Sequence, residues 1–185
     1  MAIKLYTIDK DEVINGDFIT GKTDYAFALE QFLPLIDRLE IQRKGQNPKF
    51  YSRLEDDMLK GCIMPPITLA FVGLKLNSKN ISIVEKTITK KINNAFILDG
   101  LQRMRTLQRA STRKDVTLNL KRPLFVNIIL CDSMDKLLYR MITLNNGQKP
   151  MTARHQIEII ASNVYDFSSS SIDIQTEKDT SRKRI

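Results

Sequence analysis

The sequence has little cysteine and histidine, and it lacks long apolar runs. Of its 185 residues two are cysteine and one is histidine, which excludes the usual four-ligand zinc site of Cys and His side chains. No apolar run reaches the roughly 18 residues that span a bilayer, and we expect no membrane partner. The first residues contain no apolar segment typical of a secretory signal. Two free thiols in such a chain predict a reducing compartment, and we therefore expect a cytoplasmic protein.

Basic residues outnumber acidic residues in the chain. It has 29 Lys and Arg and 21 Asp and Glu, which gives a formal net charge of +8 and a pI near 9.5. Much of the excess falls in residues 101–125, which contain seven basic side chains and one acidic side chain, a net charge of +6. This segment predicts a surface that faces phosphate groups, although a solvated helix face would show the same pattern. Its basic residues are Arg103, Arg105, Arg109, Arg113, Lys114, Lys121 and Arg122.

Aromatic residues make up only 7% of the chain. Those close to the basic segment, Phe96 and Phe125, lie in apolar runs and are expected to be strand residues. We therefore expect no platform on which single-stranded bases stack. Contacts with nucleic acid should instead be made to phosphates and should depend strongly on salt.

The apolar pattern predicts an α+β (mixed α/β) domain, with a small sheet flanked by helices and an extra N-terminal helical segment. Strands are expected at residues 3–8, 67–74, 81–84, 95–98 and 124–130. Helices are expected at residues 25–33, 50–60, 102–113 and 134–142, and after Thr152. The predicted division is an N-terminal extension at 1–63, a core domain at 64–165 and a poorly ordered basic tail at 166–185.

Three smaller features have ordinary interpretations. The acidic run Glu55-Asp56-Asp57 falls in a predicted helix, and we interpret it as a solvated face rather than a metal site. Cys62 and Cys131 lie in apolar surroundings and are interpreted as small core residues. His155, the only histidine, is expected at a helix surface or cap rather than in catalysis.

The segment FILDGLQRMRTL, residues 96–107, is the part of the sequence most suggestive of chemistry. A buried strand runs directly into a helix through Asp99 and Gly100, and glycine gives that turn its conformational freedom. The first amides of the helix lack intrahelical acceptors and favour an anion such as phosphate. Arg103, one turn into the helix, would reach the same anion. Asp99 would cap the helix, or hold Mg²⁺ or a ribose hydroxyl.

The order of four segments carries more information than this turn alone. An apolar strand follows two prolines at 65–72 (PPITLAFV), and the D-G-x-x-R turn opens the helix near residue 100. Another apolar strand follows at 123–130 (PLFVNIIL), before a helix enters an Asn-rich loop within 142–160. The order resembles the ParB/sulfiredoxin-like superfamily over residues 64–160. Within it the chain is similar to the DGQHR and DGQQR branches, which include DndB-type proteins of DNA phosphorothioation and GmrSD-type restriction proteins.

The resemblance implies two groups of nucleotide- or phosphate-binding residues, and the basic segment supplies a third group that is expected to contact nucleic acid. The turn supplies Asp99, Gly100, Gln102, Arg103 and Arg105, and a second polar loop supplies Asn145, Asn146, Gln148 and Lys149. Nucleic acid would meet Arg109, Arg113, Lys114, Lys121 and Arg122. Leu101 departs from the branch pattern, which has glutamine directly after glycine, and this puts hydrolysis in doubt. The motif contains no cysteine, which excludes sulfiredoxin-type chemistry.

The resemblance thus implies a ParB-like, nucleic-acid-associated protein that binds DNA or nucleotide phosphates, in DNA modification, phage defence or its regulation. Two alternatives stay open. One is an NTP-hydrolysing enzyme of a restriction system, with a nucleoside triphosphate and Mg²⁺ as cofactor; Asp99 would coordinate the ion, and Gln102 or Asn146 would position water. The other is a non-catalytic subunit that binds a protein partner in a larger complex. Whether the chain is an enzyme is therefore left open.

Overall fold

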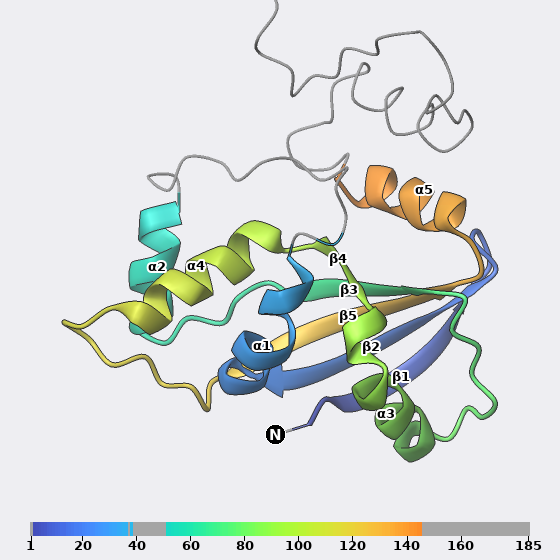
Figure 1. Cartoon of the computed structure of the whole chain (residues 1–185), viewed down its shortest axis with the longest axis horizontal. Coiled ribbons are helices and arrows are strands. Elements are labelled where there is room, and N and C mark those ends of the chain that lie inside the picture. Colours follow the sequence, from blue (N-terminus) through green and yellow to red (C-terminus); the bar gives the residue numbers. More distant parts are fainter. Residues whose placement is uncertain (1, 37, 39–50, 146–185) are drawn as a thin grey trace, which may run out of the picture. The chain divides into compact units, whose positions relative to one another are not determined.

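The computed structural model describes residues 2–36, 38 and 51–145, and in these ranges five strands form one mixed sheet (Figure 1). The strand order is β1-β2-β5-β3-β4, so β2 of the N-terminal hairpin lies beside β5, whose paired residues are 99 or more positions further along the chain. All neighbours are antiparallel except β3 and β5, which are parallel. The strands are β1 (Lys4–Asp11), β2 (Gly16–Asp24), β3 (Ile67–Val72), β4 (Phe96–Asp99) and β5 (Pro123–Cys131).

The helices alternate with the later strands, and the mixed α/β class predicted from the sequence is confirmed. They are α1 (Tyr25–Gln31), α2 (Ser52–Leu59), α3 (Ile81–Lys90), α4 (Leu101–Thr112) and α5 (Met134–Asn145), with short 3-10 turns η1 (Leu33–Leu35) and η3 (Ile92–Asn94). Within the described ranges, no helix has the length and apolar character needed to cross a membrane.

The chain divides into two compact units, Met1–Met134 and Asp135–Ile185. The first unit holds the whole sheet and helices α1 to α4, and the second holds nearly all of α5. Strands β1 and β2 therefore belong to the same unit as β3, β4 and β5, rather than to an appended extension ending at residue 63. The predicted tail, the helix after Thr152 and His155 lie outside the described residues.

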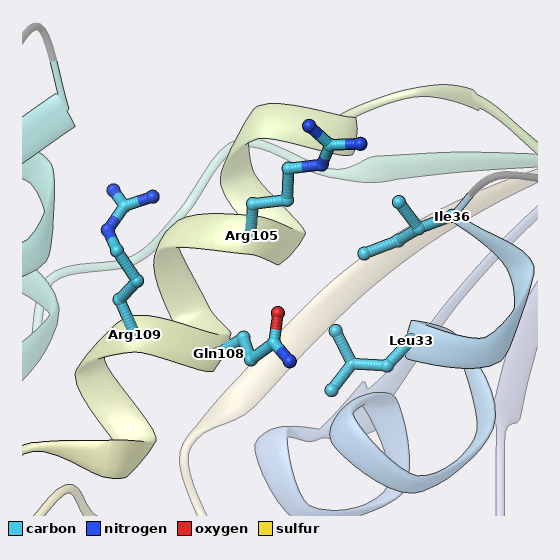
Figure 2. A pocket seen from close by; sticks show the side chains of 5 residues that line it. All are labelled: Leu33, Ile36, Arg105, Gln108 and Arg109. Atoms are coloured by element: carbon cyan, nitrogen blue, oxygen red, sulfur yellow. The ribbon is translucent and has the colours of Figure 1, made fainter. Parts of the chain in front are cut away.

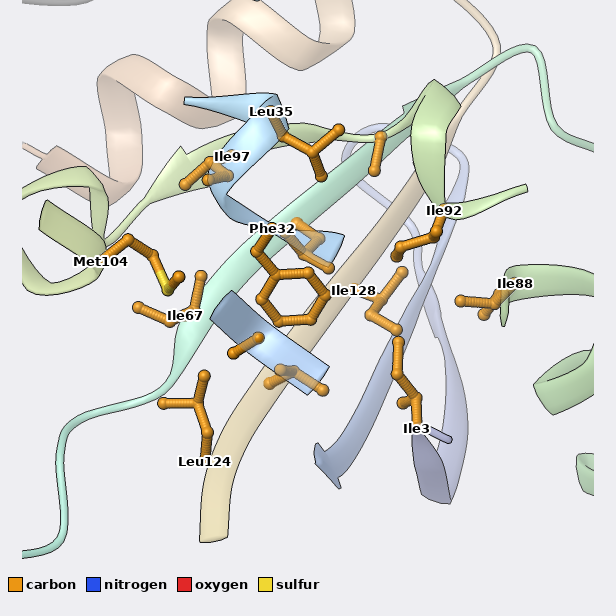
Figure 3. Close-up of a cluster of buried hydrophobic side chains, with 14 of the residues drawn as sticks. Ile3, Phe32, Leu35, Ile67, Ile88, Ile92, Ile97, Met104, Leu124 and Ile128 are labelled. Carbon is orange, nitrogen blue, oxygen red and sulfur yellow. The ribbon is translucent and has the colours of Figure 1, made fainter. Parts of the chain in front are cut away.

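The core of the first unit forms on one face of the sheet. Alternate residues of β5 enter it, namely Leu124, Val126, Ile128 and Leu130, as the period of two in a strand requires. Helices α1 and α4 and turn η1 supply the other side of this core (Figure 3). Phe32, which has no exposed surface, lies among these residues. Full burial of such a side chain stabilises the fold by about 1.5–3 kcal/mol.

The strand predicted at 81–84 is wrong, because these residues begin helix α3. Asn80 is the N-cap, and its side-chain oxygen accepts hydrogen bonds from the amides of Ser82 and Ile83 at 3.0 and 3.4 Å. Val84 and Ile88, one turn apart, are the residues of α3 that become buried. Capping and this helical spacing outweigh the β-branched character of the segment.

Strand β2 has no counterpart among the predicted strands. Its sequence, GDFITGKTD, contains two glycines and four charged or threonine side chains near its end, which gives little apolar alternation. The strand is stabilised from both sides by pairing with β1 and β5. A Cβ at Gly21 would lie 2.6 Å from the carbonyl oxygen of Lys4, so the close approach of β1 requires glycine there.

Candidate nucleic-acid interface

Gly100 forms the turn between β4 and α4, as predicted. Its φ is +104°, in the left-handed region that favours glycine. A Cβ at this position would lie 2.4 Å from Cδ1 of Ile67, a fully buried side chain of β3. Glycine is therefore required both for the backbone conformation and for close packing of the turn against the sheet.

Asp99 and Arg103 contact each other across this turn. The guanidinium of Arg103 donates to the Asp99 carboxylate through Nη2 and to the carbonyl oxygen of Pro66 through Nη1, the latter at 2.9 Å. Gly100, not Asp99, is the N-cap of α4, and no side chain caps the helix. The expectation that Asp99 caps α4 is therefore wrong. The side chain of Arg103 is only 13% exposed, so this arginine joins β4, α4 and the segment before β3.

A pocket of about 410 Å³ lies beside the middle of α4. It is lined by Leu33 and Ile36, near turn η1, and by Arg105, Gln108 and Arg109 of α4. The three α4 residues share one helix face because they are three and four positions apart. In Figure 2, Arg105 and Gln108 extend toward Ile36 and Leu33, and Arg109 rises from the next turn of the helix. Two guanidinium groups and an amide thus flank a small apolar wall.

Arg109 and Arg113 contact the acidic face of α2. Nε of Arg109 donates to Oε2 of Glu55 at 3.2 Å, and Nη2 of Arg109 donates to Thr106 Oγ1 at 3.1 Å. Nη1 of Arg113 donates to Oδ1 of Asp56 at 3.1 Å and lies 3.8 Å from Oε1 of Glu55. The prediction of a solvated acidic face therefore holds for Asp56 and Asp57, which are exposed, whereas Glu55 is mostly buried against the arginines.

Arg113 also forms a two-bond contact with Asp115, with Nε and Oδ1 at 2.9 Å. Hydrogen bonds from Arg113 lower the pKa of Asp115 to about 2. The hydrogen bond with Asp115 also raises the pKa of Arg113, with a smaller contribution from Asp56. Both pKa shifts favour the charged forms, as expected for a paired guanidinium and carboxylate.

The remaining basic residues of the segment divide into two kinds. Lys114 and Lys121 are exposed in the connection between α4 and β5. Arg122 turns inward, where Nη2 donates to the carbonyl oxygens of Gly61 and Cys62. Burial raises the pKa of the Cys62 thiol, and the Asp57 carboxylate raises it further, whereas Arg122 lowers it. Arg122 therefore holds the chain after α2 in place and is not presented for contact with nucleic acid.

Both cysteines have the structural setting that the sequence predicted. Cys131 is buried, and its Sγ lies 3.6 Å from the carbonyl oxygen of Phe71. Cys62 is half-buried and packs against the core of the first unit. The two thiols are not joined to each other.

Most of the second polar loop lies outside the described residues. Asn145 is the last residue of α5, which belongs to the second unit, and its side chain is not described. Asn146, Gln148 and Lys149 lie outside the described residues. Their predicted role in nucleotide binding stays a prediction.

A nucleoside triphosphate with Mg²⁺ fits the turn poorly. The carboxylate of Asp99, the expected Mg²⁺ ligand, accepts a hydrogen bond from Arg103, and Arg103 itself also bonds to Pro66. Both are thus already engaged with each other, and the mostly buried Arg103 also supports the segment before β3. In the part of the chain that the structure describes, no three His, Cys, Asp or Glu side chains are grouped as metal ligands. We therefore derive no hydrolytic step.

Sequence reasoning missed two parts of this surface. Leu33, Ile36 and Gln108 were not identified as pocket residues, since the pocket joins segments about 70 positions apart in the sequence. The sequence does not indicate Glu55 and Asp56 as partners of Arg109 and Arg113, because the paired residues are 54 and 57 positions apart. The helical spacing of Arg105, Gln108 and Arg109 was a usable signal for one side of the pocket.

Comparison of the chain with known protein families, with curated proteins and with solved structures finds no match. The resemblance to the ParB/sulfiredoxin-like superfamily stays a prediction from the sequence motifs. The arguments about function that follow rest on the geometry of α4 and its neighbours.

Proposed function

We propose that the protein binds nucleic-acid phosphates, those of DNA first, through the exposed face of α4. The observation that carries the proposal is the pocket where Arg105, Gln108 and Arg109 meet Leu33 and Ile36. Guanidinium groups donate several hydrogen bonds in a planar fork that matches phosphate oxygens. The context expected from the resemblance, DNA modification, phage defence or its regulation, is part of the same proposal.

Three further features support binding to a polyanion. The net charge of +8 attracts one over a long range at low salt. Lys114 and Lys121 extend the positive surface beyond α4. Thr106 holds the Arg109 guanidinium in a fixed position, which reduces the entropy lost when phosphate binds.

Phosphate binding is favoured over NTP hydrolysis by what the turn residues do. Asp99 and Arg103 bond to each other, and Arg103 also supports the segment before β3. The arginines of the pocket, Arg105 and Arg109, follow Arg103 by two and six residues, and neither is the partner of Asp99 in that contact. A free nucleotide would have to use the same arginines as DNA, so unlabelled nucleotide should compete with DNA if both bind.

The test is fluorescence anisotropy of a labelled DNA duplex across a salt series. Replacing Arg105 and Arg109 together by alanine should weaken binding about tenfold or more and lower the salt slope by about 2, since two phosphate contacts are lost. The matched control replaces Lys86 and Lys90 of α3 by alanine, an exposed pair with the same charge and the same spacing.

The comparison of these two variants distinguishes specific phosphate contacts made by the α4 arginines from a general effect of the protein's net charge. A clear loss for the α4 variant with a small loss for the α3 variant supports the proposal. Equal losses would mean that only the total charge matters. No DNA binding by the unaltered protein, in 50 mM salt or below, would remove the proposed function.

A further inference from the structure

Helix α2 places its carboxylates directly on the arginines proposed to bind phosphate. Glu55 reaches Arg109 at 3.2 Å and Arg113 at 3.8 Å, and Asp56 reaches Arg113 at 3.1 Å. The side chain of Glu55 is only 17% exposed, so it lies between the two helices. An arginine of α4 and the arginine at its C-cap thus meet two carboxylates of α2, a helix more than 40 residues earlier in the sequence.

These carboxylates occupy the guanidinium N–H donors of Arg109 and Arg113, which a phosphate would need for its own hydrogen bonds. Each presents negatively charged oxygens to a guanidinium at hydrogen-bond distance, which is how an Arg–phosphate contact is also made. Arg113 is shared further with Asp115 on the connection after α4. A nucleic-acid strand that follows α4 from Arg105 toward Arg113 would therefore meet α2 carboxylates on its way.

The ion pairs of Arg109 and Arg113 with the α2 carboxylates can be exchanged for contacts with phosphate. The side chains of Arg109 and Arg113 are 35% and 32% exposed, and ion pairs at such sites contribute little to the free energy of folding. A strand of phosphates offers the same arginines several charges and releases counterions when it binds. The exchange of carboxylate for phosphate needs no change in the buried core.

We propose that Glu55 and Asp56 act as internal competitors of nucleic-acid phosphate, so that α2 holds the affinity of α4 below its full value. This autoinhibitory contact rests on the proposed function, because it supposes that α4 binds phosphate. It assigns a role to the acidic run that neither the core nor the turn at Gly100 requires. It predicts that neutralising Glu55 or Asp56 makes the binding of nucleic acid tighter.

The experiment compares Glu55→Gln with Asp57→Asn in the DNA anisotropy assay. Both remove one negative charge from α2, and Asp57 makes no ion pair with any residue in the described ranges. Glu55→Gln should tighten binding about three- to tenfold at low salt and steepen the salt slope by about 1, as one more phosphate contact becomes available. Asp57→Asn should change affinity less than about twofold, because Asp57 is exposed and its charge is screened by solvent.

Each outcome has a distinct meaning. Equal tightening by the two variants, or none by either while the unaltered protein binds DNA, overturns the inference and leaves the proposed function standing. No binding by any of the three proteins removes the proposed function itself. Circular dichroism melting curves of the variants show that each is folded, and Asp56→Asn, which frees Arg113 from another carboxylate, gives a second independent test with the same expected direction.

Discussion

The two ends of helix α4 use their arginines differently. At its start, Arg103 is 13% exposed and bonds to Asp99 and to the backbone of Pro66. Further along, Arg109 and Arg113 are 35% and 32% exposed and pair with carboxylates of a neighbouring helix. All three are paired, yet only the first is built into the packing of strand, turn and helix. A basic residue in a motif is thus available for a ligand only to the extent that its internal contacts are weak.

The comparison predicts that the start of α4 is where substitutions destabilise the fold most. Gly100→Ala places a Cβ against Ile67 and forces a left-handed φ on alanine, and we expect a loss of about 2–4 kcal/mol of unfolding free energy. The control is Gly73→Ala, with φ +71° and no atom within 4 Å of the added Cβ; strain alone should cost about 1 kcal/mol. Urea denaturation of both measures the difference, and equal losses would show that packing against Ile67 contributes nothing.

A smaller difference in the loss of unfolding free energy should separate Arg103, at the start of α4, from Arg109, further along the helix. Arg103→Ala removes the charged partner of Asp99 and the donor to Pro66, and should cost about 1.5–3 kcal/mol. Arg109→Ala removes a half-exposed pair with Glu55 and should cost less than about 1 kcal/mol. Denaturation in urea at neutral pH checks both values. If Arg109→Ala were the more destabilising, the distinction between the two ends of the helix would be wrong.

The smallest expected effect is on how the stability of the folded protein depends on pH. The pKa of Asp115 is near 3.8 ordinarily and about 2 in the folded protein. A lowered pKa in the folded state means that the contribution of this carboxylate is present above pH 3.8 and is lost as the pH falls toward 2. Asp115→Asn should therefore reduce the loss of stability over this range while leaving the slope near neutral pH unchanged. Thermal melting from pH 2 to pH 7 measures it, and identical profiles would contradict the Arg113–Asp115 contact.

Much of the fold follows from local sequence patterns. Strands β3, β4 and β5 are short apolar runs bounded by turn residues, and Asp24 caps α1 by accepting from the amide of Phe27 at 2.8 Å. Gly61, with φ +91°, directly follows Lys60, the C-cap of α2, at the position where glycine commonly ends a helix. These features depend on residues close together in the chain, so the sequence alone predicts them.

The errors have a common cause, which is reliance on local propensity where partners decide. Residues 81–84 look like a strand because Ile and Val are β-branched, yet Asn80 caps a helix whose Glu85 accepts a hydrogen bond from the amide of Leu5 at 2.8 Å. Strand β2 looks like a loop, yet two neighbouring strands supply its hydrogen bonds. At α3 a local cap acts together with a contact from β1, whereas at β2 the stabilising hydrogen bonds come from neighbouring strands.

For the candidate site, the amino-acid sequence determined that positive charge gathers near α4 and that glycine forms the turn before it. The tertiary structure alone decided which arginines are available. It placed Arg103 on Asp99, turned Arg122 to the carbonyls of Gly61 and Cys62, and set the acidic run of α2 against Arg109 and Arg113. The physical reason is that charge is a property of composition, whereas an ion pair depends on the distance between side chains that only folding brings together.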